Sequence, residues 1–382
     1  MTGTGTGTGI PVTGIPVTGM PLRIQALGTA LPEHVHKQAD IVETFFATMP
    51  GWDPAWADVF AASGVERRAA VIDVHAFYRT SAAEAGAEAG AGAGGHGQTP
   101  GTAERMRAHQ PAARALGATA ARRALERAGP GAVADVGDLI AVSCTGYAGP
   151  GLDVHLAADL GLEAGVRRLA IGHMGCYAAL PGLRTAAALA GASGGRALVT
   201  CVELCSLHLQ PARSREEAVC QSLFGDGAGA ALVGPGGTGP RIVAARSRTV
   251  PGTEQRMGWS IDGNGFRMSL SPRVPAIIER ALAPLLAGLL DPHGLTVPEI
   301  GHWVVHPGGP EILDRVGRRL GLADACLARS RETLADGGNR SSATVLFILE
   351  SLLDSGEVSP GEWIVMLAFG TGLTLEALLL QA

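Results

Sequence analysis

Short apolar segments that end at glycine recur along this chain, and most adjoin a stretch with helical spacing of apolar residues. After a long helix predicted at 104–129, the alternation predicts strands and helices at 138–146, 167–175, 176–193, 196–206 and 222–234. The C-terminal part repeats the theme, with predicted helices at 274–290, 311–322 and 343–356 and predicted strands at 302–307, 362–370 and 372–380. This alternation predicts an α/β fold, and the repetition indicates two similar halves.

The chain has 382 residues and is 46% hydrophobic, which is enough to bury a large core. Residues 1–20 are a Thr-, Gly- and Pro-rich repeat that cannot bury a core, so we expect a disordered tail. Residues 81–101 are rich in Ala and Gly, and we expect a flexible surface insertion there. The remaining chain divides into an N-terminal half at 21–235 and a C-terminal half at 236–382.

The formal net charge of −5 argues against a general nucleic-acid-binding protein, and a polyanionic ligand would need a local cluster of arginines. The six cysteines form no CxxC pair and lack zinc spacing, so we expect reduced thiols in a cytoplasmic protein. No apolar run approaches the ~20 residues of a membrane span, and the N-terminus does not have the form of a signal peptide. No dinucleotide or phosphate-loop motif is present, and we expect no metal, nicotinamide or flavin.

Cys176 lies directly after a glycine-rich turn and at the start of a predicted helix. Unpaired N–H groups and the helix dipole favour a thiolate at such a position, so we expect a lowered pKa. Gly172 and Gly175 allow a sharp turn that aims the thiol into a cavity. Cys176 is therefore a candidate nucleophile, and the other interpretation is a buried structural cysteine.

Two further residues at glycine-rich turns complete a candidate constellation. His306 follows an apolar strand and precedes Pro-Gly-Gly, and Asn339 lies in a Gly-Gly-Asn turn. Taken alone, His306 is equally typical of a strand end at the surface, and Asn339 of a left-handed turn. Together with Cys176, they form a nucleophile with two hydrogen-bonding partners.

Six sequence blocks resemble the chalcone-synthase-like family of type III polyketide synthases: IGHMGCYAALPGLRTA, CVELCS, SLFGDGAGAALVG, HPGGPEILD, GGNRSSATVLFIL and AFGTGLTLEALLL. The resemblance runs from about residue 21 to the end and is interrupted by the insertion at 81–101. It implies a thiolase-like fold layered αβαβα from two similar halves, with one active site at their junction. It also implies a homodimer that uses an acyl-CoA starter and malonyl-CoA, with no other cofactor, nucleic acid or membrane.

The resemblance implies a role for each candidate catalytic residue. Cys176 attacks the starter and carries the growing chain as a thioester. His306 and Asn339 hold the thioester carbonyl of malonyl-CoA and stabilise the enolate formed as carbon dioxide leaves. Iterative Claisen condensation and ring closure then give a resorcinol, a pyrone or a related small phenol.

The resemblance also implies a set of cavity residues. Phe224 matches a gatekeeping phenylalanine and Phe266 more loosely matches a second one, although core packing is the other interpretation of both. Positions that vary with product in the family are Cys144, Thr145, Cys205, His208, Cys220, Met257 and Ser341. Thr371 stands where the family usually has proline. These differences disfavour a cinnamoyl starter. The blocks HPGGPEIL and GGNRSSATVLFIL resemble the resorcinol- and pyrone-forming enzymes more than the tetrahydroxynaphthalene synthases, so we expect a fatty or small aliphatic starter.

CoA phosphates need cations at the mouth of the tunnel, and Arg67 and Arg68 match a basic stretch of the family that supplies them. Solvated surface charge is the other interpretation of these two arginines. Gly308 and Gly309 allow close backbone approach to the ligand.

Three alternative functions make different predictions. A β-ketoacyl carrier-protein synthase III-type enzyme would extend the chain once and accept a carrier protein. A papain-like cysteine hydrolase shares the order Cys, His, Asn, but its cysteine lies near the mature N-terminus in another context. A non-catalytic acyl-CoA-binding member of the fold would not need all three residues.

Overall fold

The computed structural model describes residues 21–49, 51–78 and 100–382. The predicted tail at 1–20 and the predicted insertion at 81–101, apart from its last two residues, lie outside these ranges. Within the described residues, no helix combines the length and apolar character that crossing a membrane requires.

Nine strands form one sheet in the order β11-β12-β13-β8-β1-β7-β6-β4-β5. Their bounds are Leu22–Ala30 (β1), Val136–Ser143 (β4), Arg167–Gly172 (β5), Arg196–Leu204 (β6), Asp226–Pro235 (β7), Arg241–Thr249 (β8), His302–Val305 (β11), Trp363–Gly370 (β12) and Thr374–Gln381 (β13). β4 pairs in parallel with β5 and β6, and β11 pairs in parallel with β12. The two parts of the sheet meet where Arg23 of β1 pairs with Arg241 of β8.

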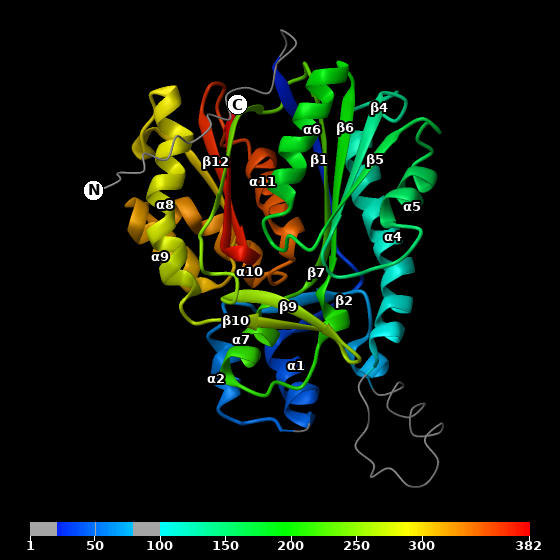
Figure 1. Cartoon of the computed structure of the whole chain (residues 1–382), viewed down its shortest axis with the longest axis vertical. Helices are drawn as coiled ribbons and strands as arrows, with labels where there is room; N and C mark the ends of the chain where they lie inside the picture. The colour runs from blue at the N-terminus through cyan, green and yellow to red at the C-terminus, as the bar shows by residue number, and fades with distance from the viewer. Residues whose placement is uncertain (1–20, 50, 79–99) are drawn as a thin grey trace, which may run out of the picture.

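Helices cover the sheet in three layers (Figure 1). The central layer is α6 (Ala179–Ser193) and α11 (Thr344–Asp354), which lie between the two parts of the sheet. On one outer face lie α4 (Thr102–Arg127) and α5 (Leu152–Asp159), and on the other α8 (Val274–Leu290) and α9 (Pro310–Leu320). The predicted αβαβα layering is therefore confirmed.

The central layer is apolar because both of its helices are enclosed. Leu183, Ala187 and Ala190 of α6 and Leu346 and Leu349 of α11 are fully buried in one cluster with residues from both parts of the sheet. Such burial stabilises each leucine side chain by roughly 1.5–3 kcal/mol relative to exposure. The cluster therefore fixes the starts of α6 and α11 relative to each other.

Smaller elements lie beyond one end of the sheet (Figure 1). They are α1 (Gln38–Thr44), α2 (Trp56–Ala61), α7 (Arg215–Leu223), α10 (Ala328–Ala335), the pair β2 (His34–Lys37) and β3 (Arg67–Ala70), and the hairpin β9 (Met257–Asp262) with β10 (Gly265–Leu270). The hairpin has no counterpart among the predicted elements, because its strands are short and partly exposed.

Two sequence expectations need correction. α6 begins at Ala179, so Cys176 lies in the turn before the helix and not at its first position. β5 was expected to be a short apolar strand, but it lies at the sheet edge and its residues are largely exposed. The division at 235/236 stays a prediction.

We predict that Gly28→Ala destabilises the chain, because a Cβ there would lie 2.4 Å from both Ala120 O and Ala124 N of α4. Neither atom can move without shifting α4 from β1, so the expected loss is about 1–3 kcal/mol of unfolding free energy. Gly165→Ala is the control, since nothing lies within 4 Å of its added Cβ. Chemical denaturation measures both variants, and equal stability would contradict the packing of α4 on β1.

Candidate active site

The turn that carries Cys176 is bent by two residues with positive φ. His173 has a φ of +58° and Gly175 a φ of +80°, a region that non-glycine residues seldom adopt. The Thr371 hydroxyl donates a hydrogen bond to Met174 O at 3.1 Å and so ties the turn to the loop after β12. The residue that replaces the family's usual proline therefore makes a specific contact at this site.

Asn339 is fixed by backbone bonds to the end of α7. Its N–H donates to Leu223 O at 2.8 Å, and its carbonyl accepts from Gly225 N at 3.1 Å. The side-chain oxygen accepts from Ser341 N at 2.8 Å, and Ser341 itself has a φ of +45°. The Asn339 amide lies beside the Cys176 thiol, with Nδ2 3.9 Å and Oδ1 4.0 Å from Cys176 Sγ.

His306 follows β11 and is 1% exposed. Its backbone N–H donates to Leu367 O at 2.8 Å, which holds it at the end of the strand. Among the described residues, neither ring nitrogen has a hydrogen-bond partner. Burial lowers the pKa of His306 to about 3, so its imidazole is neutral at physiological pH.

The expected low pKa of Cys176 is wrong for the free chain. Burial is the largest influence and raises the pKa of this thiol to about 11, while hydrogen bonds with Ser341 and Asn339 lower it only in part. The helix dipole is weakened at Cys176 because α6 starts three residues later, and the dipole effect is confined to the first turn. Cys176 is therefore an uncharged thiol in the free chain, and His306 is a neutral, unpartnered imidazole that lines the same pocket.

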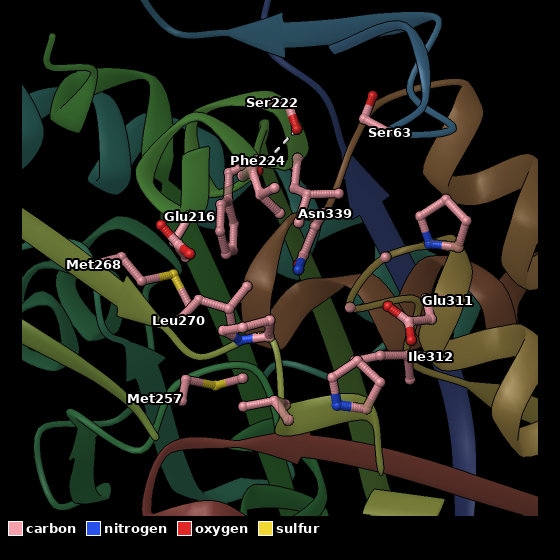
Figure 2. A pocket seen from close by; sticks show the side chains of 18 of the residues that line it. Ser63, Glu216, Ser222, Phe224, Met257, Met268, Leu270, Glu311, Ile312 and Asn339 are labelled. Atoms are coloured by element: carbon pink, nitrogen blue, oxygen red, sulfur yellow. Dashed lines mark hydrogen bonds between the residues drawn. The ribbon is translucent and has the colours of Figure 1, made fainter. Parts of the chain in front are cut away.

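The three candidate catalytic residues line one pocket of about 340 Å³. Figure 2 shows the Asn339 side chain beside the Phe224 ring, with Met268 and Leu270 together on one wall. The other predicted residues in the lining are Met257, Gly308 and Gly309. Sequence reasoning missed Glu216 and Glu311 in this lining, because nothing in their local pattern marks a pocket.

Near Cys176, a buried carboxyl group is hydrogen-bonded to several of the predicted cavity residues. Glu203 Oε2 accepts hydrogen bonds from Cys144 Sγ at 3.3 Å and from Thr145 Oγ1 at 3.0 Å. Cys144 Sγ also contacts Ser341 Oγ at 3.3 Å. Burial raises the pKa of Glu203 to about 7. Sequence reasoning missed Glu203, although a lone charge inside the apolar block CVELCS was a usable signal.

The second gatekeeper position differs from the prediction. Phe266 is 3% exposed and stacks on His208, with ring centroids 4.4 Å apart, and neither residue is part of the pocket lining. Met268 lies two residues further along β10 and does line the pocket. Because residues i and i+2 share one face of a strand, the loose sequence match identified the correct face but not the residue.

Cys205 and Cys220 are buried near the pocket but outside its lining. Cys205 packs in a small cluster with Cys176, Leu223 and Phe224. Cys220 lies on α7, one residue after the lining residue Val219. Neither thiol lines the pocket, although each lies next to residues that do.

Arg68 is not at a tunnel mouth. It is 4% exposed, and its guanidinium donates to Gln38 Oε1 at 2.8 Å and to Phe224 O at 3.4 Å, so it is a structural cation in the core. Arg67 is exposed and pairs with Asp336. Neither arginine lines the pocket, because alternation along β3 turns one inward and the other to solvent.

Comparison with known proteins agrees with this geometry. The family model "Chalcone and stilbene synthases, N-terminal domain" matches residues 18–237, and the corresponding C-terminal domain matches residues 241–382. A 1,3,6,8-tetrahydroxynaphthalene synthase from Streptomyces peucetius subsp. caesius is 36% identical over 94% of this chain and 92% of that protein. A 3,5-dihydroxyphenylacetyl-CoA synthase from Streptomyces toyocaensis is 31% identical over 94% and 90%.

Solved structures of type III polyketide synthases also resemble this chain in fold. The 1,3,6,8-tetrahydroxynaphthalene synthase of Streptomyces coelicolor A3(2) superposes with a TM-score of 0.83 at 29% identity, covering 94% of this chain and 99% of that one. PKS-I of the brown alga Ectocarpus siliculosus gives a TM-score of 0.84 at 29% identity, with coverage of 95% and 98%.

A buried thiol, an imidazole and an amide at the junction of a thiolase-like fold define a condensing enzyme. The chain belongs to the chalcone and stilbene synthase family and is a type III polyketide synthase, an acyltransferase. This membership favours iterative condensation over the single-condensation and hydrolase alternatives.

We predict that His306→Gln suppresses alkylation of Cys176 by iodoacetamide at pH 7.5 by on the order of a hundredfold or more, because the thiol loses its base. In the variant, alkylation of Cys176 should stay slow until the pH is well above neutral, because burial raises the pKa of the thiol and no neighbouring base offsets it. Peptide mass spectrometry measures the alkylated fraction against pH. The exposed Cys326 is the internal control and should react equally in both chains. Unchanged Cys176 reactivity would contradict the assignment of His306 as base.

Proposed function

We propose that this enzyme loads an acyl group from an acyl-CoA onto Cys176, extends it with decarboxylated malonyl units, and cyclises the product. The observation that carries the proposal is the Asn339 amide within 3.9–4.0 Å of Cys176 Sγ, in a pocket that also holds an unpartnered, buried His306. A nucleophile with two hydrogen-bonding partners in a water-poor cavity suits acyl transfer.

Loading begins when His306 takes the proton of the Cys176 thiol. The thiolate and imidazolium formed stabilise each other, which offsets the burial that raises the thiol pKa. The thiolate attacks the thioester carbonyl of the starter, and the CoA thiolate leaves and recovers a proton from His306. Since the pKa of His306 is lowered to about 3, the imidazolium releases that proton readily and returns to its neutral form.

Extension uses the same two side chains as donors. A neutral imidazole has one N–H, and Asn339 Nδ2 supplies the second, so both can hydrogen-bond the carbonyl oxygen of malonyl-CoA. Loss of carbon dioxide leaves an enolate at that oxygen. The enolate carbon attacks the thioester on Cys176, and the extended chain leaves the cysteine as a CoA thioester. Decarboxylation generates the carbanion, so no strong base is required.

The substrate proposal follows from the lining. Met257, Met268, Leu270 and Phe369 give the pocket an apolar wall that suits a fatty or small aliphatic starter. The relatives are named as a 1,3,6,8-tetrahydroxynaphthalene synthase, a 3,5-dihydroxyphenylacetyl-CoA synthase and an α-pyrone synthesis polyketide synthase-like protein. We accordingly propose a resorcinol, a pyrone or a related small phenol as the product.

CoA thioesters are the substrates of this proposal, and no further cofactor enters it. We also propose that the enzyme is a cytoplasmic homodimer. Each protomer consists of two structural halves, 21–235 and 236–382. The exposed edge strand β5 supports the dimer, because it presents unpaired backbone groups and apolar side chains such as Leu169, which is 41% exposed.

The test is incubation of the purified enzyme with a panel of acyl-CoA starters and ¹³C-labelled malonyl-CoA, followed by mass spectrometry. We expect cyclic products that contain several labelled units, none with Cys176→Ala, and wild-type amounts with the control Cys326→Ser, whose thiol is exposed. A single β-ketoacyl product, formed only from carrier-protein-bound malonate, would contradict the proposal.

A further inference from the structure

The hairpin of β9 and β10 forms one wall of the active-site pocket without belonging to the nine-stranded sheet. Met257 of β9 and Met268 and Leu270 of β10 line the pocket, as Figure 2 shows. In the described part of the chain, the two strands pair only with each other. A two-stranded hairpin is at best marginally stable by itself. The position of this wall must therefore be set by contacts outside the strand ladder.

Arg267 joins the middle of this hairpin to α7 and to the segment before it. Its Nη1 donates to Glu217 Oε2 at 2.7 Å, and its Nη2 donates to Gln210 Oε1 at 2.7 Å. Gln210 is 1% exposed, and its Nε2 donates in turn to the carbonyl of Phe266 at 3.0 Å. Both the arginine and the backbone of β10 are therefore bonded to the same buried glutamine.

The carboxylate that holds Arg267 is itself fixed at the start of α7. Glu217 Oε2 also accepts from Arg213 N at 2.8 Å, and the Glu217 N–H donates to the N-cap side chain, Ser214 Oγ, at 3.3 Å. The side chains of Arg267 and Glu217 are only 15% and 22% exposed. Water and salt weaken such a shielded ion pair less than a pair at the surface. The pair therefore joins β10 to an ordered helix terminus.

α7 supplies a neighbouring wall of the same pocket. Val219, Ser222 and Leu223 of this helix line the cavity together with the hairpin residues. Arg267 is not part of the lining, because alternation along β10 places it on the opposite face from Met268. A change at Arg267 would therefore alter the spacing of two walls and leave the chemical groups that face the substrate in place.

A second attachment holds the tip of the hairpin. The N–H of Thr102, at the start of α4, donates to Gly263 O at 3.0 Å. The Thr102 hydroxyl accepts from Gly265 N at 2.7 Å and donates to the carbonyl of Asp262. The tip cannot move away from α4 unless these bonds break. Attachments to two different helices, α7 and α4, thus hold the hairpin in place (Figure 1).

We propose that Arg267, through Glu217 and Gln210, positions the hairpin wall and so determines the length of acyl chain that the pocket accepts. This inference rests on the proposed function, because that function places an acyl starter on Cys176. The ion pair fixes the distance between the hairpin wall and α7, and an acyl chain must fit between them. Arg267 acts through the wall residues and does not touch the substrate, so it is a positioning residue for chain-length selection.

The test measures the rate at which Cys176 is loaded from dodecanoyl-CoA and from butanoyl-CoA, by mass spectrometry of the intact protein. Arg267→Gln removes the ion pair, so the hairpin can move away from α7 and make room for the longer chain. The ratio of dodecanoyl to butanoyl loading should rise about tenfold or more, since a single methylene in an apolar pocket is discriminated at this level. Thr102→Val releases the hydroxyl bonds at the tip and should shift the ratio in the same direction.

Two control variants separate positioning from a general effect on the fold. Arg267→Lys keeps the charge beside Glu217 but lacks the fork that also reaches Gln210, so its ratio should lie closer to the wild type. Arg114→Gln removes the ion pair with Asp159, whose bonds are 2.5 Å long and lie outside the pocket lining, and it should keep the wild-type ratio.

Three results would overturn the proposal. They are an unchanged loading ratio in Arg267→Gln, an equal loss of both loading rates in that variant, and a shift of the same size in Arg114→Gln. If circular dichroism shows that Arg267→Gln does not fold, Thr102→Val decides the question by the same ratio.

The wild-type enzyme separates this inference from the proposed function. If neither acyl-CoA loads Cys176 in the wild type, the proposed function is wrong, and the inference that rests on it is wrong as well. If the wild type loads both starters and extends them with malonyl-CoA, but the loading ratio is the same in the hairpin variants, the proposed function stands and only the role of Arg267 is wrong.

Discussion

The enclosure of two apolar helices between the two parts of one sheet is the constraint on which the site depends. α6 and α11 bury their leucines and alanines in a single cluster, so neither can slide relative to the other. Cys176 lies three residues before α6, and Asn339 lies five residues before α11. Packing of the central layer therefore brings the thiol and the amide together, although they are 163 residues apart in the sequence.

The same burial determines the protonation states of Cys176 and His306. Removal from water raises the pKa of Cys176 and lowers that of His306, so the free site holds an uncharged thiol and an uncharged imidazole. A neutral imidazole can accept a proton from the thiol in one step and donate a hydrogen bond to an enolate in another. In the mechanism that we propose, burial allows one histidine to serve both loading and extension, and it keeps water away from the thioester.

Much of this arrangement could be predicted from sequence where a pattern is local. The apolar periodicity of α8 predicted its bounds at 274–290 correctly. The glycine-rich turns identified Cys176, His306 and Asn339, and all three line one pocket. Their proximity could not come from periodicity, because it depends on the packing of distant helices; it came from the family resemblance.

The predictions that were wrong concern the surroundings of individual side chains, which depend on the packing of residues distant in sequence. Arg68 was expected to bind CoA phosphate at the tunnel mouth, with solvated surface charge as the other interpretation, but β3 turns it inward onto Gln38. Phe266 was predicted to be a gatekeeping residue, but its ring stacks on His208. The thiolate at Cys176 was expected from helix position alone, whereas desolvation is the larger effect.

The most direct test of the account is peptide mapping of the enzyme after brief exposure to an acyl-CoA starter without malonyl-CoA. The acyl group should be found on Cys176 alone, and not on the neighbouring buried thiols Cys144 and Cys205. Adduct formation should be lost in Cys176→Ala. An acyl group on either neighbour, or loading that persists in the variant, would contradict the central claim that Cys176 is the nucleophile.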